Sequence, residues 1–374
     1  MTSELDRSLY FKNLDASRFF AFILVFLAHC FVTTDPIIES NWAFQRIYAW
    51  GKVGVLGLEY FFVLSSFLIS IVILEEKKQT SNFHLGNFLI RRSLRVWPLY
   101  FLIIGIGLII TSFPQLIVGV NPLPPWPYLF FFLVNFYIIQ HGTEFLFFIA
   151  FLWSISIEEQ FYLIWSLFMK FIRLRFPVFC LLMILTSVVF RFLFSENSDM
   201  LYFHTISALG NFGIGGLLAY GMFKKHNIIL KIKALKTMWV KALYTLMLLS
   251  IAFYHQLMSF ESFAIFSRLF YALFFSWYIL DQTWGENRVF EGGKIKFFNY
   301  LGKISYGLYC YHGVVITLLI VILRNITIPQ SLGMVFVLFP FIIICVTVLL
   351  SHLSYRYFER YFLKLKSKFY TFKP

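Results

Sequence analysis

Charge is the property that this sequence has least of. Asp, Glu, Lys and Arg make up only 13% of its 374 residues, and 60% of the residues are hydrophobic. A soluble domain carries roughly 25% charged and 45–50% apolar residues. The composition therefore excludes an ordinary soluble domain and predicts an integral membrane protein. Acidic residues are the scarcer charged type, 18 against 32 Lys and Arg. A surplus of basic residues can indicate nucleic-acid binding. Here the placement of the Lys and Arg residues along the chain instead favours a role in membrane topology.

Cysteine and the common ligand-binding motifs are scarce as well. The four cysteines lie far apart in apolar segments, without a CxxC pair. We therefore expect small apolar side chains and no disulfide framework. The sequence has no HExxH motif and no glycine-rich phosphate loop, so we expect no metal. The first 13 residues are polar, and no small-residue cleavage site follows the first apolar run, which we expect to remain as a membrane helix.

Long apolar runs account for most of the chain. A membrane helix needs about 20 apolar residues, and ten runs approach this length. We therefore expect an all-α fold, a polytopic membrane bundle of about ten transmembrane helices. The stretch 128–140 is shorter, and its length alone does not decide whether it spans the membrane, is re-entrant or lies outside. The ten runs lie near 14–34, 54–74, 96–113, 150–169, 177–194, 204–223, 242–259, 262–280, 301–323 and 331–354.

The basic residues fall in alternate connections between these runs. If 128–140 does not cross the membrane, most Lys and Arg lie on one side, which the positive-inside rule assigns to the cytoplasm. If it does cross, every later basic loop faces outward. We therefore expect both termini in the cytoplasm and a single domain over 1–374. Residues 1–13 would form the cytoplasmic N-terminus, and 355–374 a basic tail against anionic lipid heads.

Arg18 and His29 lie inside the first apolar run. Ionisable residues in a membrane span are costly and usually face the bundle interior. Eleven residues of helix advance about 16.5 Å in about three turns, so both side chains share one face of the helix at two depths. Their separation along the helix is about the reach of a pantetheine arm. An arginine could then hold a phosphate while an imidazole acts at the far end. Alternatively, His29 is an interhelical hydrogen-bond partner and Arg18 only snorkels to the interface.

Two glutamates are candidates for orienting His29. Glu59 and Glu158 are expected at membrane depth, and a carboxylate beside an imidazole fixes its tautomer and raises its basicity. His29 with either glutamate would be a base for a hydroxyl nucleophile. Glu158 could instead pair with a structural arginine such as Arg268.

Three further polar residues lie in apolar runs. Arg191 and Arg268 either line an acceptor cavity or pair with a glutamate, and we favour pairing. We expect His312 to be a satisfied polar contact and not a second base.

Arg91, Arg92 and Arg95 form a basic loop before the third apolar run. Taken alone, such a cluster is an ordinary topology signal. The functional alternative is a polyphosphate site, because arginines bind phosphate with two parallel hydrogen bonds and Arg91 and Arg95 are neighbours on a helix. Arg18 enters the membrane from the same side and could share the ligand.

Six segments, in this order, together resemble the acyltransferase-3 family over nearly the whole chain. This sequence departs from the family pattern at Ser66, where glycine is usual and helix contact would be looser, and at Glu59, where aspartate is more common. The six segments are Leu14–Arg18 with His29, Phe61–Ile69, Arg91–Pro98, Trp153–Tyr162, Leu301–His312 and Tyr355–Glu359.

The resemblance implies a bacterial O-acyltransferase of the inner (cytoplasmic) membrane. Its donor would be cytoplasmic acyl-CoA, most commonly acetyl-CoA, with Arg18, Arg91, Arg92 and Arg95 binding it and His29 as the catalytic residue. The acceptor would be a hydroxyl of a surface polysaccharide or lipid-linked glycan. Many relatives carry an extracytoplasmic hydrolase-like domain; this chain is expected to act alone or with a separate transferase.

Two alternative functions involve no catalysed reaction. A glycolipid or polysaccharide transporter fits the same spans and charges, but the sequence shows no repeats with paired Gly/Pro interruptions. A scaffold subunit of a polysaccharide assembly complex leaves the spacing of Arg18 and His29 unexplained.

Overall fold

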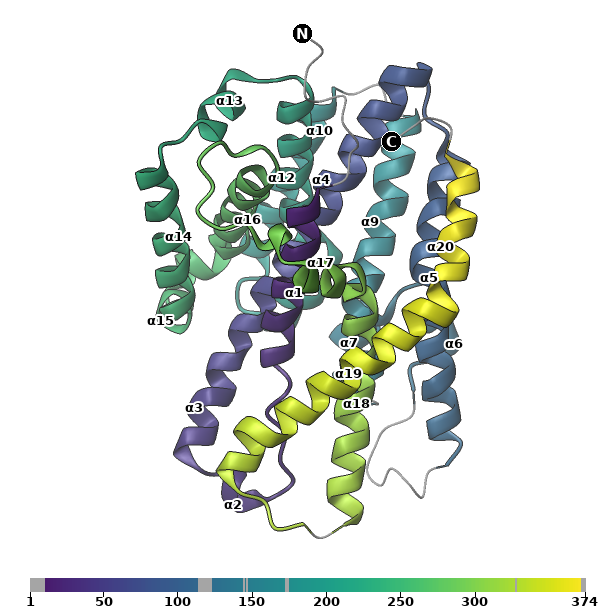
Figure 1. The fold of residues 1–374 in the computed structure, drawn as a ribbon, viewed down its shortest axis with the longest axis vertical. Helices are drawn as coiled ribbons and strands as arrows, with labels where there is room; N and C mark the ends of the chain where they lie inside the picture. Colours follow the sequence, from purple (N-terminus) through teal and green to yellow (C-terminus); the bar gives the residue numbers. More distant parts are fainter. Residues whose placement is uncertain are drawn as a thin grey trace.

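The structure is a computed structural model that describes residues 11–113, 123–143, 145, 147–171, 175–326 and 328–370. Over these residues the chain is helical and contains no strand (Figure 1). Within the same residues, eight continuous helical rods are long and apolar enough to cross a membrane. The protein is an integral membrane protein, and the expected all-α bundle is confirmed. The rods run over 42–80, 85–111, 147–171, 176–193, 198–223, 261–284, 305–325 and 334–369.

The helices that form these rods match the predicted apolar runs. The first and seventh predicted runs are shorter helices of 16 residues each, α1 (Lys12–Leu27) and α14 (Thr237–Ala252). The rods contain α3 (Trp42–Gly51), α4 (Val55–Thr80), α5 (Leu85–Thr111), α8 (Phe147–Ala150), α9 (Leu152–Phe171), α10 (Phe176–Leu193), α11 (Ser198–Phe203), α12 (Thr205–Phe223), α16 (Glu261–Trp284), α18 (Ser305–Asn325), α19 (Phe339–Ser354) and α20 (Arg360–Lys366). The connections contain α2 (Pro36–Glu39), α6 (Trp126–Phe130), α7 (Val134–His141), α13 (Asn227–Lys233), α15 (Tyr254–Met258) and α17 (Lys296–Lys303).

The stretch 128–140 forms two short helices instead of a span. Phe132 has a positive φ of 56°, which breaks the helical path between α6 and α7. The two helices have 5 and 8 residues, well short of the roughly 20 that a span requires. Their length agrees with the expectation that this stretch does not cross the membrane.

Glycines bring α1, α4 and α12 into close contact. A Cβ atom on Gly57 of α4 would lie 2.3 Å from the carbonyl oxygen of Ala21 in α1, and one on Gly215 of α12 would lie 2.4 Å from that of Val63. Small residues at helix crossings allow such approach in membrane bundles. The looser contact expected at Ser66 is not found, because Ser66 is fully buried and its Oγ donates to the Phe212 carbonyl at 2.5 Å.

The basic segments gather toward one end of the molecule. In Figure 1, α13 and the end of α20 lie in the upper half, whereas α2, α3 and the end of α18 lie in the lower half. The segment after 355 is a helix that continues α19 through the π-helical turn Tyr355–Glu359 and packs along α5. It is therefore part of the bundle, where we expected a tail lying on lipid.

Candidate active site

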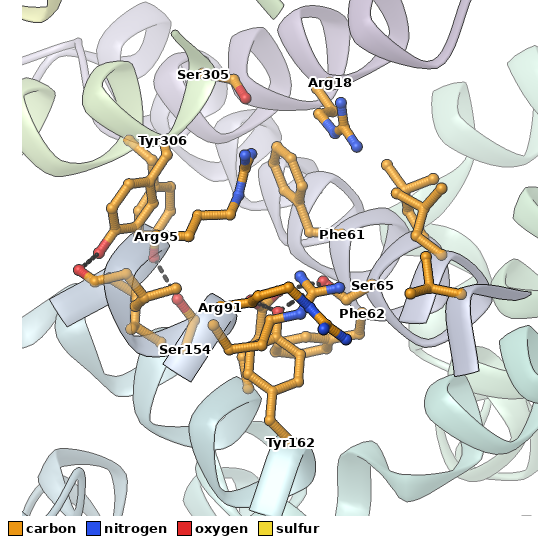
Figure 2. A pocket seen from close by; sticks show the side chains of 18 of the residues that line it. Arg18, Phe61, Phe62, Ser65, Arg91, Arg95, Ser154, Tyr162, Ser305 and Tyr306 are labelled. Carbon is orange, nitrogen blue, oxygen red and sulfur yellow. Dashed lines mark hydrogen bonds between the residues drawn. The ribbon is translucent and has the colours of Figure 1, made fainter. Parts of the chain in front are cut away.

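A first cavity of about 260 Å³ contains the arginines that the sequence singled out. We call it the basic pocket. Arg18 reaches it from α1 and Arg91, Arg92 and Arg95 reach it from α5, so the expected grouping of these four side chains is observed. Figure 2 shows Arg18, Arg91 and Arg95 approaching the space from different directions. Lys366 of α20 also lines it; its position could not be predicted because we expected its segment to lie on lipid.

Two of these arginines have acidic partners. Arg18 donates to Asp15, one helical turn earlier on α1. Arg91 is 3% exposed and pairs with the buried Glu76 at 3.2 Å, and it also donates to the carbonyl of Phe369 at 2.6 Å. Arg91 therefore ties α5 to α4 and to the end of the last helix. Its position is that of a structural residue at the edge of the pocket.

The other two arginines keep their donors available. Arg92 lies over the ring of Tyr162 at 5.1 Å and has no hydrogen bond within the described part of the chain. Arg95 is half-buried and forms no ion pair or hydrogen bond with any described residue. Guanidinium groups bind phosphates with two parallel hydrogen bonds. Arg92 and Arg95 are therefore the side chains best placed to bind a phosphate-bearing ligand here.

Glu158 lies in the basic pocket and not beside His29. One of its oxygens accepts a hydrogen bond from Ser65 at 3.1 Å and the other accepts one from Tyr162 at 2.7 Å. These contacts join α4 to α9 within the second and fourth family-like segments. The alternative pairing of Glu158 with Arg268 is not formed, because Arg268 lines the second cavity.

The second cavity has a volume of about 900 Å³ and contains His29, so we call it the histidine cavity. Its wall also includes Glu59, Arg191 and Arg268. Leu58 lines both this cavity and the basic pocket. Arg18 and His29 thus lie in adjacent cavities on either side of a leucine, where we expected one continuous passage.

His29 follows the end of α1 and bonds back to it. Its Nδ1 lies 2.7 Å from the carbonyl oxygen of Val25. A carbonyl only accepts, so Nδ1 carries the hydrogen and Nε2 of the neutral ring carries the free lone pair. The ring packs edge-on against Phe151 at 4.6 Å. This tautomer leaves Nε2 available as a base.

Neither predicted carboxylate orients this imidazole. Glu59 pairs with Arg268 at 2.9 Å and accepts a hydrogen bond from Asn211, and Glu158 lies in the basic pocket. The physical reason is twofold. Buried Arg268 requires a counter-charge. At the end of α1 the backbone N–H of His29 bonds to the Phe26 carbonyl, so the Val25 carbonyl lacks its usual helical donor and accepts from the His29 ring as well as from the backbone N–H of Ala28. The pairing that we favoured for Arg268 is therefore observed, with Glu59.

His312 lies closer to His29 than the sequence indicated. It is fully buried, and its ring centre is 5.8 Å from that of His29. Its Nδ1 lies 2.5 Å from the Tyr309 carbonyl, whereas Nε2 has no partner among the described residues. The expectation of a satisfied polar contact is thus met at one nitrogen only. The sequence could not predict that these two histidines lie close together, because they come from segments far apart in the chain.

The fold and these cavities define a membrane-embedded helical protein with a basic pocket and a histidine cavity. A family described as "Acyltransferase domain" matches residues 11–356. The chain belongs to this acyltransferase-3 family, as its six segments indicated.

Several named relatives are similar over part of the chain. Peptidoglycan O-acetyltransferase OatA of Listeria monocytogenes is 33% identical over 34% of this chain and 21% of its own length. O-acetyltransferase OatA of Staphylococcus aureus is 27% identical over 56% of this chain and 34% of its own. Putative O-acetyltransferase SACOL0978 of S. aureus is 26% identical over 87% and 55%. The chain thus spans about a fifth to a half of these relatives. No solved structure matches it.

Proposed function

We propose that this protein is an O-acetyltransferase of the cytoplasmic membrane. It takes an acetyl group from cytoplasmic acetyl-CoA and transfers it to a hydroxyl of a cell-envelope polysaccharide or lipid-linked glycan. The observation that carries the proposal is the position of α1. This one helix places Arg18 in the basic pocket and is followed by His29 in the adjacent histidine cavity. The family and the O-acetyltransferase names of the relatives support the reaction class.

The basic pocket is the donor side of this proposal. Arg92, Arg95 and Lys366 bind the phosphates of acetyl-CoA, and Arg18 extends the positive lining along α1. The cavity volume of about 260 Å³ is below the roughly 300–1,000 Å³ of sites for drug-sized ligands. It therefore takes the narrow thioester end of the donor, with the nucleotide at its mouth. The basic ends of α13 and α20 lie on the same side, which we assign to the cytoplasm.

His29 supplies the base for the transfer. Its Nε2 accepts the proton of the acceptor hydroxyl while the hydroxyl oxygen attacks the thioester carbonyl. A carbon–oxygen bond forms, the carbon–sulfur bond breaks, and the imidazolium returns the proton to the departing thiolate. The same lone pair would serve if His29 first accepted the acetyl group itself. In both routes the Val25 carbonyl holds Nδ1–H and directs Nε2.

The test is acetyl transfer by a His29→Ala variant. We expect transfer from labelled acetyl-CoA to envelope glycan in isolated membranes to fall by about 10²–10⁴-fold, the usual contribution of a general acid–base residue. His255→Ala is the matched control, because His255 lines the same cavity but is exposed at its rim. Thermal unfolding should show that both variants remain folded.

Full activity of a folded His29→Ala protein would remove the histidine from the mechanism. Mass spectrometry of envelope glycans separates the enzyme from a transporter. The enzyme adds an acetyl mass to the glycan, whereas a transporter changes its location and not its mass.

A further inference from the structure

The histidine cavity contains two deeply buried arginines but one buried carboxylate. Arg191, Arg268 and Glu59 are 4%, 5% and 4% exposed. Glu59 is fully engaged, with one oxygen 2.9 Å from Nε of Arg268 and the other accepting from Asn211. The group therefore retains a net positive charge inside an apolar bundle. Such a charge is costly to bury without a partner of opposite sign.

Arg191 is held in place by neutral groups. Its Nε donates to the Ile265 carbonyl at 2.7 Å, its Nη1 to Ser207 Oγ at 2.9 Å and its Nη2 to the Ala264 carbonyl at 2.5 Å. These acceptors fix the orientation of the guanidinium but carry no charge, so the only nearby carboxylate among the described residues is Glu59, which is already paired with Arg268. No carboxylate pairs with it in the described part of the chain.

Arg268 lies next to Arg191 and has a spare donor. The two guanidinium groups donate to adjacent carbonyls of α11, Arg191 to Leu201 at 3.2 Å and Arg268 to Tyr202 at 2.9 Å. Nη1 of Arg268 has no hydrogen-bond partner among the residues that the structure describes. A buried guanidinium with an unused N–H indicates a ligand that accepts hydrogen bonds.

The rim of the cavity does not supply the missing negative charge. Apart from the buried groups, His29 and neutral tyrosines, its charged residues and histidines are Lys52, Asp199 and His255, all exposed. The lysine offsets the aspartate, so the surplus stays with the buried arginines. A ligand with a negative charge would neutralise it.

We infer that the acceptor binds in this cavity through an oxyanion, a phosphate or a carboxylate, held by Arg268 and Arg191. Arginine forks match both groups. The inference rests on the proposed function, in which His29 of this cavity takes the proton of the acceptor hydroxyl. The anion anchors the acceptor and presents its hydroxyl to His29 in the same cavity. It restricts the substrate class to acidic acceptors, either a glycan on a lipid phosphate or a sugar that carries a carboxylate.

Binding of simple sugars to the purified protein in detergent tests this inference. The probes are glucose 1-phosphate, glucuronate and glucose, measured by isothermal titration calorimetry. We expect both anionic sugars, or one of them, to bind at least about tenfold more tightly than glucose. A preference for glucose 1-phosphate indicates a lipid-linked phosphate as the anchor, and one for glucuronate indicates an acidic sugar. Equal affinity for all three probes overturns the inference.

Variants assign the effect to the buried arginines. Arg268→Gln should weaken anion binding at least about tenfold and leave glucose binding unchanged. Arg46→Gln is the matched control, since it removes an exposed charge of α3 outside the cavity and should change neither. If Arg268→Gln does not fold, Glu59→Gln tests the same charge balance, because removing the carboxylate should tighten anion binding. Unchanged anion binding in a folded variant of either kind overturns the inference.

Acetyl transfer measured on the same samples separates this inference from the proposed function. Transfer to glucose as efficient as transfer to the anionic sugars overturns the anion site and leaves the O-acetyltransferase. Arginine-dependent anion binding with no transfer to any hydroxyl, including native envelope glycan, overturns the O-acetyltransferase and leaves the anion site.

Discussion

At the scale of single residues, the arginines of the basic pocket divide by their partners. Arg91 is buried against Glu76 and the Phe369 carbonyl, whereas Arg95 forms no ion pair with a described residue. Sequence and family resemblance placed both in one donor site. The structure indicates that Arg91 holds helices together and that Arg95 is free to bind an anionic ligand, which we propose is the donor.

Substitution of these two arginines should therefore have opposite consequences. Arg95→Gln should weaken acetyl-CoA binding about 10–100-fold, since a hydrogen bond to a charged group contributes about 1.5–3 kcal/mol. Its thermal stability should stay near that of the parent. Arg91→Gln removes the arginine that pairs with Glu76, and breaking a buried pair costs about 3–5 kcal/mol. Calorimetric titration with acetyl-CoA and thermal unfolding in detergent measure the two effects.

The reverse result would contradict this division of roles. In that result, the Arg95→Gln protein would be destabilised but bind acetyl-CoA normally. The Arg91→Gln protein would be stable but would not bind acetyl-CoA.

Much of this site could be predicted from the sequence at the residue scale. Arg18 and His29 stand out because each is ionisable within an apolar run, and the structure places each in a cavity. The partner of His29 could not be predicted. Glu59 and Glu158 were candidates by depth alone, but partner choice depends on interhelical distances, and a local carbonyl lies closer to the imidazole.

At the scale of helices, a residue of α4 lies between the basic pocket and the histidine cavity. Leu58 lines both and is 7% exposed. The next residue, Glu59, pairs with Arg268, so the main chain here is held in place while the leucine side chain forms the partition. In the proposed reaction the thioester has to pass this leucine to reach His29.

The size of residue 58 should therefore affect the rate of transfer much more than donor affinity, which depends mainly on the phosphate contacts. Leu58→Trp should lower the rate of acetyl transfer about a hundredfold, because small misplacements of reacting groups have effects of this order. Leu163→Trp is a suitable control, since Leu163 is 49% exposed on α9 and lies outside both cavities. Single-turnover transfer and acetyl-CoA titration give the two quantities. Equal transfer rates for Leu58→Trp and Leu163→Trp would show that the acetyl group takes another path.

Helix identity was easier to predict than helix ends. Eight of the ten apolar runs match helices long enough to span a bilayer, and the other two match the shorter helices α1 and α14. The joining of α3 to α4 in one rod of 39 residues was not predicted, and neither was the helical continuation after 355. Both segments are polar enough to resemble connections, and their packing against the bundle overrides that composition.

At the scale of the whole molecule, the two cavities differ in their lining, which makes the two ends of the proposed transfer path unlike each other. The basic pocket lies with the arginines of α5 and Lys366 of α20, and the histidine cavity holds His29, Glu59 and the buried arginines. In the proposed reaction, donor and acceptor therefore approach from different sides of Leu58. The acetyl group is the part of the donor small enough to pass between them.

Transfer across a sealed membrane tests this account most directly. Purified protein is reconstituted in proteoliposomes of known orientation, with labelled acetyl-CoA on one side and a membrane-impermeant anionic sugar acceptor on the other. We predict acetylated acceptor when acetyl-CoA is on the side of α13 and the end of α20, and loss of this product in the His29→Ala protein. Equal product formation after acetyl-CoA and the acceptor have exchanged sides would contradict the account.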